Sequence, residues 1–201
     1  ELVGIYLSAH PLDQFYLELT YGCNTKLADM EKKASELDQE VTFGGLITSY
    51  EEKEARSGNK YGKIVIEDYT GKYDLMLFGN NYIEYNKFGI KGLAIMVKGV
   101  FRKGRFNDRI SFNIASITPL DEVKGKLLSN LTIQVPEDRF ADLSPLKESI
   151  TESTENRCSL NFRIFTDDRK HYVDMRSQYK IPINKQVLKK LESMEMEFSI
   201  N

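Results

Sequence analysis

The sequence predicts a mainly β protein with an α+β part: a small five-stranded barrel, a short α+β domain after it, and a helical lead-in before it. Three observations support this fold class. Five segments within residues 41–119 alternate apolar and polar residues with a period of two, as strands do. Residues 1–40 space their apolar residues as helices do, and in residues 120–201 strand-like and helix-like segments alternate. We therefore expect three parts with these boundaries.

The lead-in, residues 1–40, is expected to contain two helical segments and a linker. Helical spacing runs as far as His10, where Pro11 disfavours a helical conformation at the preceding residue. A second apolar stripe with helical spacing covers residues 12–19. The acidic stretch at residues 29–40 predicts an exposed linker that enters the barrel.

The barrel, residues 41–119, is expected to have strands at 41–52, 61–67, 73–78, 93–101 and 109–117, with a short helix at 80–88. Gly44 and Gly45 should let the first strand coil sharply, because they carry no side chain. In the last strand, Ile110, Phe112 and Ile114 are expected to face inward. Three strands, a helix and two strands is the order of a barrel of the oligonucleotide-binding (OB) type.

The last part, residues 120–201, predicts a small α+β domain with strands at 131–135, 160–165, 171–175 and 196–200, the middle two paired. A helix is expected at 143–149 and a second, amphipathic helix at 184–194. Asn184 is a good N-cap for the second helix, and Val187, Leu188 and Leu191 fall on one of its faces.

The composition indicates a globular chain with a packed core. Apolar residues make up 41% of it, and no run reaches the roughly eighteen apolar residues of a membrane helix. Cys23 and Cys158 lie far apart and outside any CxxC motif, so we expect free thiols, no zinc site, no membrane association and a cytoplasmic location. Because residue 1 is Glu rather than Met, we expect a piece of a longer protein.

The charge is unevenly distributed along the chain. The net charge of −2 combines −5 in residues 1–40, +4 in residues 41–119 and −1 in residues 120–201. Only the middle part is basic, with 12 Lys and Arg against 8 Asp and Glu. This excess favours a groove for a phosphate backbone and excludes strong nonspecific binding of duplex DNA.

The candidate ligand surface lies where OB barrels bind, on the face of strands 2 and 3 and in the loops between strands 1 and 2 and between strands 4 and 5. Single-stranded nucleic acid needs cations for its phosphates and flat side chains for its bases. The expected nucleic-acid-binding residues are Lys53, Arg56, Lys60, Tyr61, Lys63, Arg102, Lys103, Arg105, Phe106 and Arg109. We expect Phe78 and Tyr82 to pack at the end of the barrel instead. The alternative is that the loops are merely solvated and the barrel is a protein-interaction or structural spacer module without DNA contact.

Groupings that could support catalysis are scarce. His10 and His171 have no accompanying nucleophile and acid, and neither a Walker lysine loop nor a GxGxxG motif follows a strand. Adjacent carboxylates such as Asp167 and Asp168 are more often solvated than metal-binding. We therefore expect no catalytic residue, no cofactor-binding residue and no metal ligand in this chain.

Three blocks of the sequence resemble a known family. Residues 2–13, LVGIYLSAHPLD, resemble the segment before the OB domain in the alpha (polymerase) subunit of bacterial DNA polymerase III. Residues 62–78, GKIVIEDYTGKYDLMLF, resemble the core of that OB domain, and residues 181–201 are similar to the family's last helix and strand. The resemblance covers essentially the whole chain.

The resemblance implies a non-catalytic C-terminal fragment of a replicative DNA polymerase. The family's catalytic palm, with its metal-binding aspartates, lies upstream, so divalent metal is expected only there. The OB domain is expected to contact single-stranded template DNA, and the last domain to dock the tau subunit of the clamp loader in the replisome. Residues 1–40 contain no clear sliding-clamp motif, since Gln14 begins only a poor match, and clamp binding is not expected.

Overall fold

The computed structural model describes residues 10–104, 108–126, 129–147, 157–166 and 168–200. The chain forms two compact units, Glu1–Val123 and Lys124–Asn201, and each is described by itself. Among the described residues, no helix combines the length and the apolar character needed to cross a membrane.

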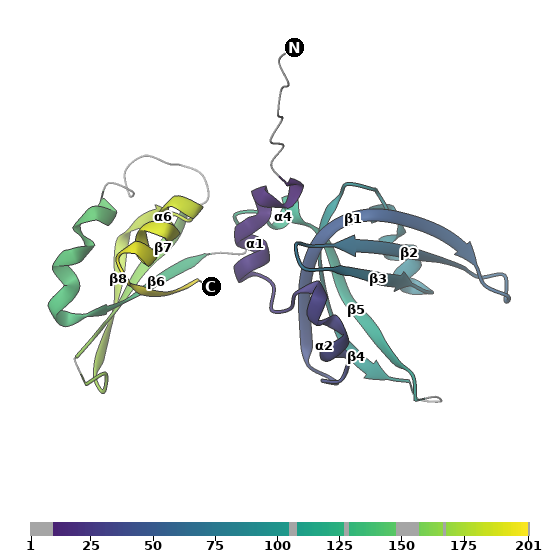
Figure 1. Ribbon diagram of the computed structural model, residues 1–201, viewed down its shortest axis with the longest axis horizontal. Coiled ribbons are helices and arrows are strands. Elements are labelled where there is room, and N and C mark those ends of the chain that lie inside the picture. The colour runs from purple at the N-terminus through teal and green to yellow at the C-terminus, as the bar shows by residue number, and fades with distance from the viewer. Residues whose placement is uncertain (1–9, 105–107, 127–128, 148–156, 167, 201) are drawn as a thin grey trace, which may run out of the picture. The chain divides into compact units, whose positions relative to one another are not determined.

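The first unit is built on a five-stranded antiparallel sheet (Figure 1). Its strands are β1 (Glu40–Glu54), β2 (Lys60–Glu67), β3 (Lys72–Leu77), β4 (Ala94–Lys103) and β5 (Ile110–Pro119). The order in the sheet is β3-β2-β1-β4-β5. The predicted fold class, a five-stranded OB-type barrel followed by a smaller α+β part, is confirmed.

The barrel core follows from the period-two pattern of its strands. In β2 and β3 the inward residues Ile64, Ile66, Leu75 and Leu77 are fully or almost fully buried, as the alternation predicts. The Phe43 ring lies at the centre and contacts the Tyr73 ring of β3 and the Phe112 ring of β5, each at a centroid distance of 5.6 Å. Aromatic packing therefore connects β3 with β5 across the core.

The first residue of β5 departs from the predicted inward pattern. Phe112 and Ile114 pack against the core as expected, but Ile110 is 47% exposed. Ile110 pairs with Lys103 at the far end of the β4–β5 hairpin. Alternation along a strand marks a face, but that face is buried only where another element covers it.

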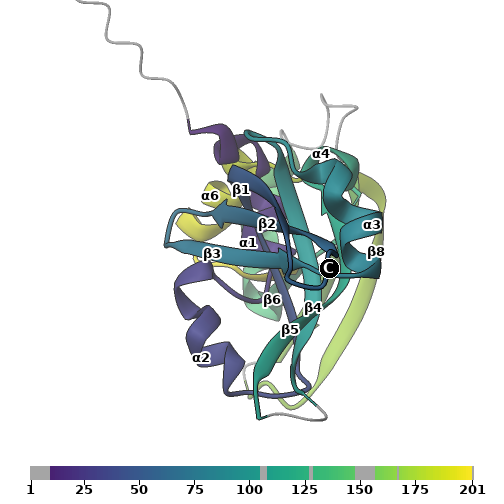
Figure 2. The same cartoon turned by 90° about the vertical axis from the view of Figure 1, so that its right-hand side faces the viewer.

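Short helices close the barrel. Helix α3 (Asn80–Tyr85) and the 3-10 helix η3 (Asn86–Phe88) lie between β3 and β4, as predicted, and α4 (Leu120–Val123) follows β5. Helix α2 (Met30–Ala34) comes from the lead-in. Figure 2 shows α2 and α3 at different sides of the barrel. Both contribute to the core, since Met30 and Tyr85 are buried in it.

The lead-in packs on the barrel over much of its described length. It consists of the 3-10 helix η1 (Pro11–Phe15), helix α1 (Tyr16–Tyr21), the 3-10 helix η2 (Leu27–Asp29) and α2. The prediction of an exposed linker at residues 29–40 is wrong for its first part, because Met30 is only 3% exposed and packs in the barrel core beside Leu27. Because the segment is short and charged, its two apolar residues do not form a periodic pattern from which their burial could have been predicted.

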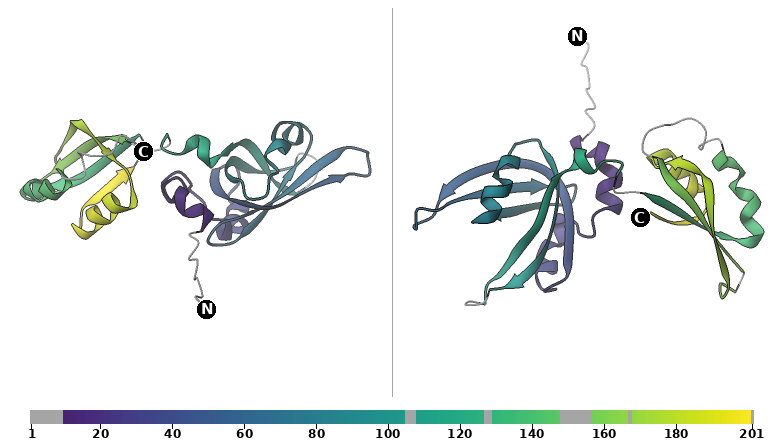
Figure 3. Two further views of the ribbon diagram at one scale, coloured as in Figure 1. Left: turned by 90° about the horizontal axis from the view of Figure 1, so that it is seen from above. Right: turned by 180° about the vertical axis from the view of Figure 1, so that it is seen from behind.

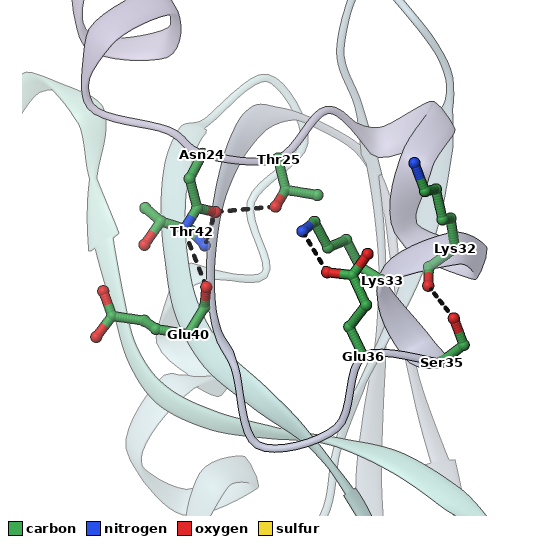
Figure 4. A network of polar contacts seen from close by, with 8 residues as sticks. All are labelled: Asn24, Thr25, Lys32, Lys33, Ser35, Glu36, Glu40 and Thr42. Carbon is green, nitrogen blue, oxygen red and sulfur yellow. Dashed lines mark hydrogen bonds and ion pairs between the residues drawn. The ribbon is translucent and has the colours of Figure 1, made fainter.

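Asn24 joins the lead-in to the start of β1 (Figure 4). Its side-chain oxygen accepts hydrogen bonds from the backbone N–H of Thr42 at 2.8 Å and from the Thr25 hydroxyl at 2.9 Å. Its side-chain nitrogen donates to the Glu40 carbonyl at 2.9 Å. A single amide thus satisfies backbone groups at the edge of β1 that would otherwise face solvent or remain unpaired.

Asp68, in the turn between β2 and β3, forms a second connection between the lead-in and the barrel. One carboxylate oxygen accepts hydrogen bonds from Thr70 and from the Gly71 backbone, and the other accepts from the Leu27 N–H at 3.0 Å. The neighbouring Tyr69 donates its hydroxyl to Asp13 of η1. The β2–β3 turn is therefore held by the lead-in rather than projecting freely.

The second unit is a four-stranded sheet with helices on one side (Figure 3, left). Its strands are β6 (Asn130–Pro136), β7 (Arg157–Phe165), β8 (Tyr172–Pro182) and β9 (Glu197–Ile200), in the order β8-β7-β6-β9. Strands β6 and β7 are parallel and the other neighbours antiparallel. Helix α6 (Lys185–Ser193) begins after Asn184, whose side chain accepts a hydrogen bond from the Val187 N–H, as predicted.

One face of this sheet carries the core of the second unit. Leu131, Ile133 and Leu160 are at most 1% exposed, as is Leu191 of α6. The predicted helix at 143–149 is in fact a 3-10 helix, η4 (Glu137–Leu146), and residues 148 and 149 lie outside the described residues. Alternate strand residues lie on the other face and several of them are polar, among them Thr132 and Asn161, which are opposite each other in the ladder.

Candidate nucleic-acid interface

The first predicted loop is the tip of a long hairpin. Strands β1 and β2 pair as far as Glu54 and Lys60, and the Ala55 N–H donates to the Asn59 carbonyl at 2.9 Å. Gly58 has a φ of 80°, a backbone conformation that glycine adopts without strain. Arg56 is exposed at this tip, and no ion pair joins it to another described residue. The tip therefore offers a cation and backbone groups to a ligand.

Three of the predicted cations near this hairpin are paired with carboxylates. Their ammonium nitrogens lie within 2.8 Å of a carboxylate oxygen in the pairs Lys53–Glu51, Lys60–Glu52 and Lys63–Asp74. The hydrogen bonds from these lysines hold the pKa values of Glu51 and Glu52 below their usual range. Exposed pairs of this kind contribute little to stability, so a phosphate could replace the carboxylate as the partner.

The second predicted loop shows the same arrangement. Arg102 pairs with Asp38 at 3.2 Å and Lys103 with Asp108 at 2.8 Å, both at the exposed end of the β4–β5 hairpin. Arg109 is exposed, and its carbonyl accepts a hydrogen bond from the Gly104 N–H at 2.8 Å. The predicted contacts Arg105 and Phe106 lie outside the described residues. The hairpin end is thus cationic, but two of its cations already have acidic partners.

Tyr61 and Phe78 form an aromatic pair beside the first loop. Their ring centroids are 5.2 Å apart with an interplanar angle of 31°. Phe78 is 57% exposed, so the expectation that it packs at the barrel end is wrong. The chain turns sharply at Gly79, which has a φ of 53°, and α3 therefore starts without carrying the Phe78 ring into the core. Tyr82, one turn later, does pack against the core as expected.

A groove of about 500 Å³ connects this aromatic pair with the first loop. It is lined by Ala55, Ser57, Asn59, Lys60, Tyr61, Phe78, Gly79, Tyr82 and Ile83. Glu52 accepts hydrogen bonds from both Lys60 and the Tyr82 hydroxyl, and so links the hairpin to α3 at the groove. The groove offers what one or two nucleotides need: flat apolar rings, a cation and polar groups.

The Tyr50 ring packs between β2 and the end of η3. It lies between Gly62 of β2 and Gly89, just after η3. A Cβ atom at Gly89 would lie 2.5 Å from the Tyr50 ring, and one at Gly62 would lie 2.9 Å from it. Only glycine leaves room for the ring at both positions, so these residues position the helix that forms one side of the groove.

The outer face of β2 and β3 is less cationic than predicted. Lys63, Val65 and Met76 are half-buried on this face, as expected for an apolar and cationic surface. The pairing register, however, places Asp74 directly opposite Val65 and within reach of Lys63. The sequence could not reveal this carboxylate as a neighbour, because only the register brings it there.

The titratable residues described next have structural roles and do not indicate a metal or catalytic site. Within the described residues, no three His, Cys, Asp or Glu side chains gather in a way that could hold a metal ion. His10 caps η1, where its Nδ1 accepts a hydrogen bond from the Leu12 N–H at 3.2 Å. Asp168 accepts hydrogen bonds from Thr166 and Lys170 within its turn, while Asp167 lies outside the described residues.

Both cysteines are expected to react slowly in the folded protein. Burial raises the pKa of Cys23 from 9.0 to about 12 and that of Cys158 to about 11. At pH 8 the reactive thiolate of Cys23 should therefore be about a thousandfold rarer than in the unfolded chain. Mass spectrometry after timed treatment with iodoacetamide, with and without urea, measures this. Native and unfolded rates within about tenfold of each other would contradict it.

The same shifts predict how stability depends on pH. Because folding raises both thiol pKa values, their contribution to stability is present below about pH 9 and is lost as the pH rises toward about 12. Replacing Cys23 and Cys158 with Ser should therefore reduce the fall in the free energy of unfolding between pH 9 and pH 12. Urea titrations at several pH values measure this.

Comparison with known proteins identifies the barrel. Residues 41–120 match the family model described as an OB-fold nucleic acid binding domain. Among solved structures, the yeast mitochondrial single-stranded DNA binding protein Rim1 is similar over 40% of this chain and 92% of its own, with 19% identity and a TM-score of 0.31.

Curated relatives extend the similarity beyond the barrel. The DNA polymerase III subunit alpha of Borreliella burgdorferi is 29% identical over 161 residues, which are 78% of this chain and 14% of that protein. The same subunit of Haemophilus influenzae is 26% identical over 70% of this chain and 12% of its own length. That of Aquifex aeolicus is 21% identical over 100% of this chain and 17% of its own length. The chain thus matches a small part of these relatives.

Proposed function

Because this chain is related to the alpha subunit of bacterial DNA polymerase III and contains an OB-fold nucleic acid binding domain, we propose that its barrel holds single-stranded template DNA. The observation that carries the proposal is the groove in which the half-buried Tyr61 ring and the exposed Phe78 ring lie beside the cationic first loop. Bases would stack on the rings while Arg56 and Lys60 contact the phosphates. The DNA-synthesising activity of the whole relatives is not proposed for this chain.

Fluorescence anisotropy tests the proposal directly. The full chain is titrated into labelled oligo-dT and into a duplex of matched length at low salt. We expect weak, salt-sensitive binding with a preference for the single strand, because the aromatic pair can stack only on unpaired bases. Equal binding of both nucleic acids, or no binding, would instead favour the alternative that the barrel is a protein-interaction or spacer module.

The β4–β5 loop should contribute through charge. Replacing both Arg102 and Lys103 with Ala should weaken oligo-dT binding and lower the slope of log affinity against log salt by about 1.4, since each lost phosphate contact on a single strand removes about 0.7. The control removes two exposed lysines elsewhere on the same unit, Lys26→Ala with Lys91→Ala. If both double variants change the slope equally, the effect comes from overall charge and not from this loop.

A second candidate function, partner docking, is favoured by an apolar pocket in the second unit. The pocket has a volume of about 390 Å³ and lies between η4, β7 and β8. Phe140 and Tyr179 line it and remain substantially exposed, while Leu143 and Leu160 form its buried side. Exposed aromatic rings around a pocket are typical anchors of protein interfaces. From the family resemblance, the partner we propose is the tau subunit of the clamp loader.

Binding to purified tau subunit, measured by biolayer interferometry, tests this docking. Phe140→Ala and Tyr179→Ala should each weaken binding, whereas Val173→Ala, which truncates an exposed apolar residue of β8 outside the pocket, should not. Equal effects of all three variants would exclude the pocket as the docking site.

A further inference from the structure

The second unit has a polar sheet face that neither the barrel nor the apolar pocket explains. Helices η4 and α6 cover the opposite face of this sheet (Figure 3, left). On the polar face lies a pocket of about 360 Å³. It is lined by Asn130, Thr132, Ser159, Asn161, Arg176 and Ser177. No carboxylate contributes to this lining.

The strand register explains why these side chains meet. Asn130 lies opposite Ser159, Thr132 opposite Asn161, and Asn161 in turn opposite Arg176. Residues opposite each other in a ladder point to the same face, so donors from three strands converge. A register shift between Ser159 and Asn161 adds residues to β8 and brings Ser177 to the pocket as well.

The hydrogen-bonding capacity of the pocket is largely unused. No hydrogen bond or ion pair within the described part of the chain involves the side chains of Thr132, Ser159, Asn161 or Arg176. Asp174, two residues before Arg176 on β8, already accepts two hydrogen bonds of 2.7 and 2.9 Å from Arg163. Among the residues that the structure describes, Arg176 is thus a cation without an acidic partner, surrounded by neutral donors, which suits an anionic oxygen.

The surroundings favour a nucleic-acid phosphate over other anions. On the same face Tyr172 is 59% exposed, and the Arg163 guanidinium lies 4.5 Å from the centre of its ring. Lys180 lies opposite Ser159 at the other end of the polar pocket. An exposed aromatic ring, cations along a sheet and amides that can both donate and accept are what unpaired nucleotides use.

We propose that this polar face of the β8-β7-β6-β9 sheet is a second binding surface for single-stranded nucleic acid, separate from the barrel. Arg176, with Asn161 and Thr132, holds a phosphate, and Tyr172 stacks on a base. This surface goes beyond the proposed function of the barrel and does not depend on it.

NMR on the full chain can test the two surfaces separately. Oligo-dT is titrated into ¹⁵N-labelled protein, and the side-chain amides of Asn130 and Asn161 are followed in the wild type and in a Tyr61→Ala, Phe78→Ala double variant. We expect saturable shifts at both asparagines in both proteins. Shifts confined to the barrel in the wild type would overturn the second surface and leave the barrel proposal intact.

Two variants and a control localise the effect. Arg176→Ala and the isosteric Asn161→Asp should each weaken the binding seen at Asn130 by about tenfold or more, because a charge-assisted contact is lost or a like charge is added. Lys189→Ala removes one exposed positive charge from α6 and should leave the binding seen at Asn130 unchanged. Equal effects of Lys189→Ala and Arg176→Ala would overturn the proposal. So would oligo-glutamate shifts that saturate as oligo-dT shifts do, since they would identify an acidic peptide site.

Discussion

Replacing Tyr61 and Phe78 together with Ala is expected to weaken oligo-dT binding by the barrel by about 5- to 150-fold. The two rings form one stacking surface, and each stacked base contributes about 1–3 kcal/mol. Neither ring belongs to the fully buried core, so the folded barrel should persist. Oligo-dT titrations at fixed salt, followed by NMR shifts of barrel amides, measure the change at the barrel itself, and circular dichroism confirms that the fold is retained.

Two further variants separate stacking from a general loss of apolar surface. Tyr61→Phe keeps a flat ring and should bind almost as the wild type does. Ile90→Ala truncates a residue that is equally exposed but lies outside the groove, and should have no effect. If Ile90→Ala weakens binding as much as Phe78→Ala does, the aromatic pair is not the contact.

Replacing Phe43 with Ala is expected to lower the free energy of unfolding of the first unit by about 3–5 kcal/mol. The side chain is completely buried and contacts the Tyr73 ring of β3 and the Phe112 ring of β5, so truncation leaves a cavity between those strands. Urea titrations followed by NMR peaks of each unit measure this change. Resolved peaks are needed because a chain of two units need not unfold in one transition.

The second unit is the internal control for this experiment. Its peaks should keep their midpoint when Phe43 is changed, because Phe43 belongs to the first unit. Phe43→Leu should lose much less stability, since most of the cavity stays filled. A loss below about 1 kcal/mol for Phe43→Ala would mean that β3 and β5 do not depend on this ring.

The barrel could be predicted from the sequence because its strands are covered on one side over most of their length. Ile64, Ile66, Leu75 and Leu77 alternate with polar residues and are all buried. The same rule failed at Ile110, which is 47% exposed at the end of its strand. It also failed for Met30, because a helix of five residues shows too little of its period to reveal a buried face.

The candidate site was harder to predict than the fold. The basic loops were visible in the sequence, but their acidic partners were not, because Asp74 reaches Lys63 only through strand pairing and Asp38 reaches Arg102 from the lead-in. The exposure of Phe78 depends on the turn at Gly79. Likewise, the polar pocket of the second unit depends on the parallel pairing of β6 with β7, which residue patterns do not specify.

The ion pairs around the barrel have a kinetic consequence. In the proposed complex with single-stranded DNA, a phosphate would take Lys60 or Lys103 from its carboxylate, and that carboxylate would stay close enough to recapture the cation when the strand shifts. Each DNA contact then has a short lifetime, because an intramolecular competitor is always present. We therefore expect rapid dissociation of bound oligo-dT and easy sliding of a single strand along the barrel.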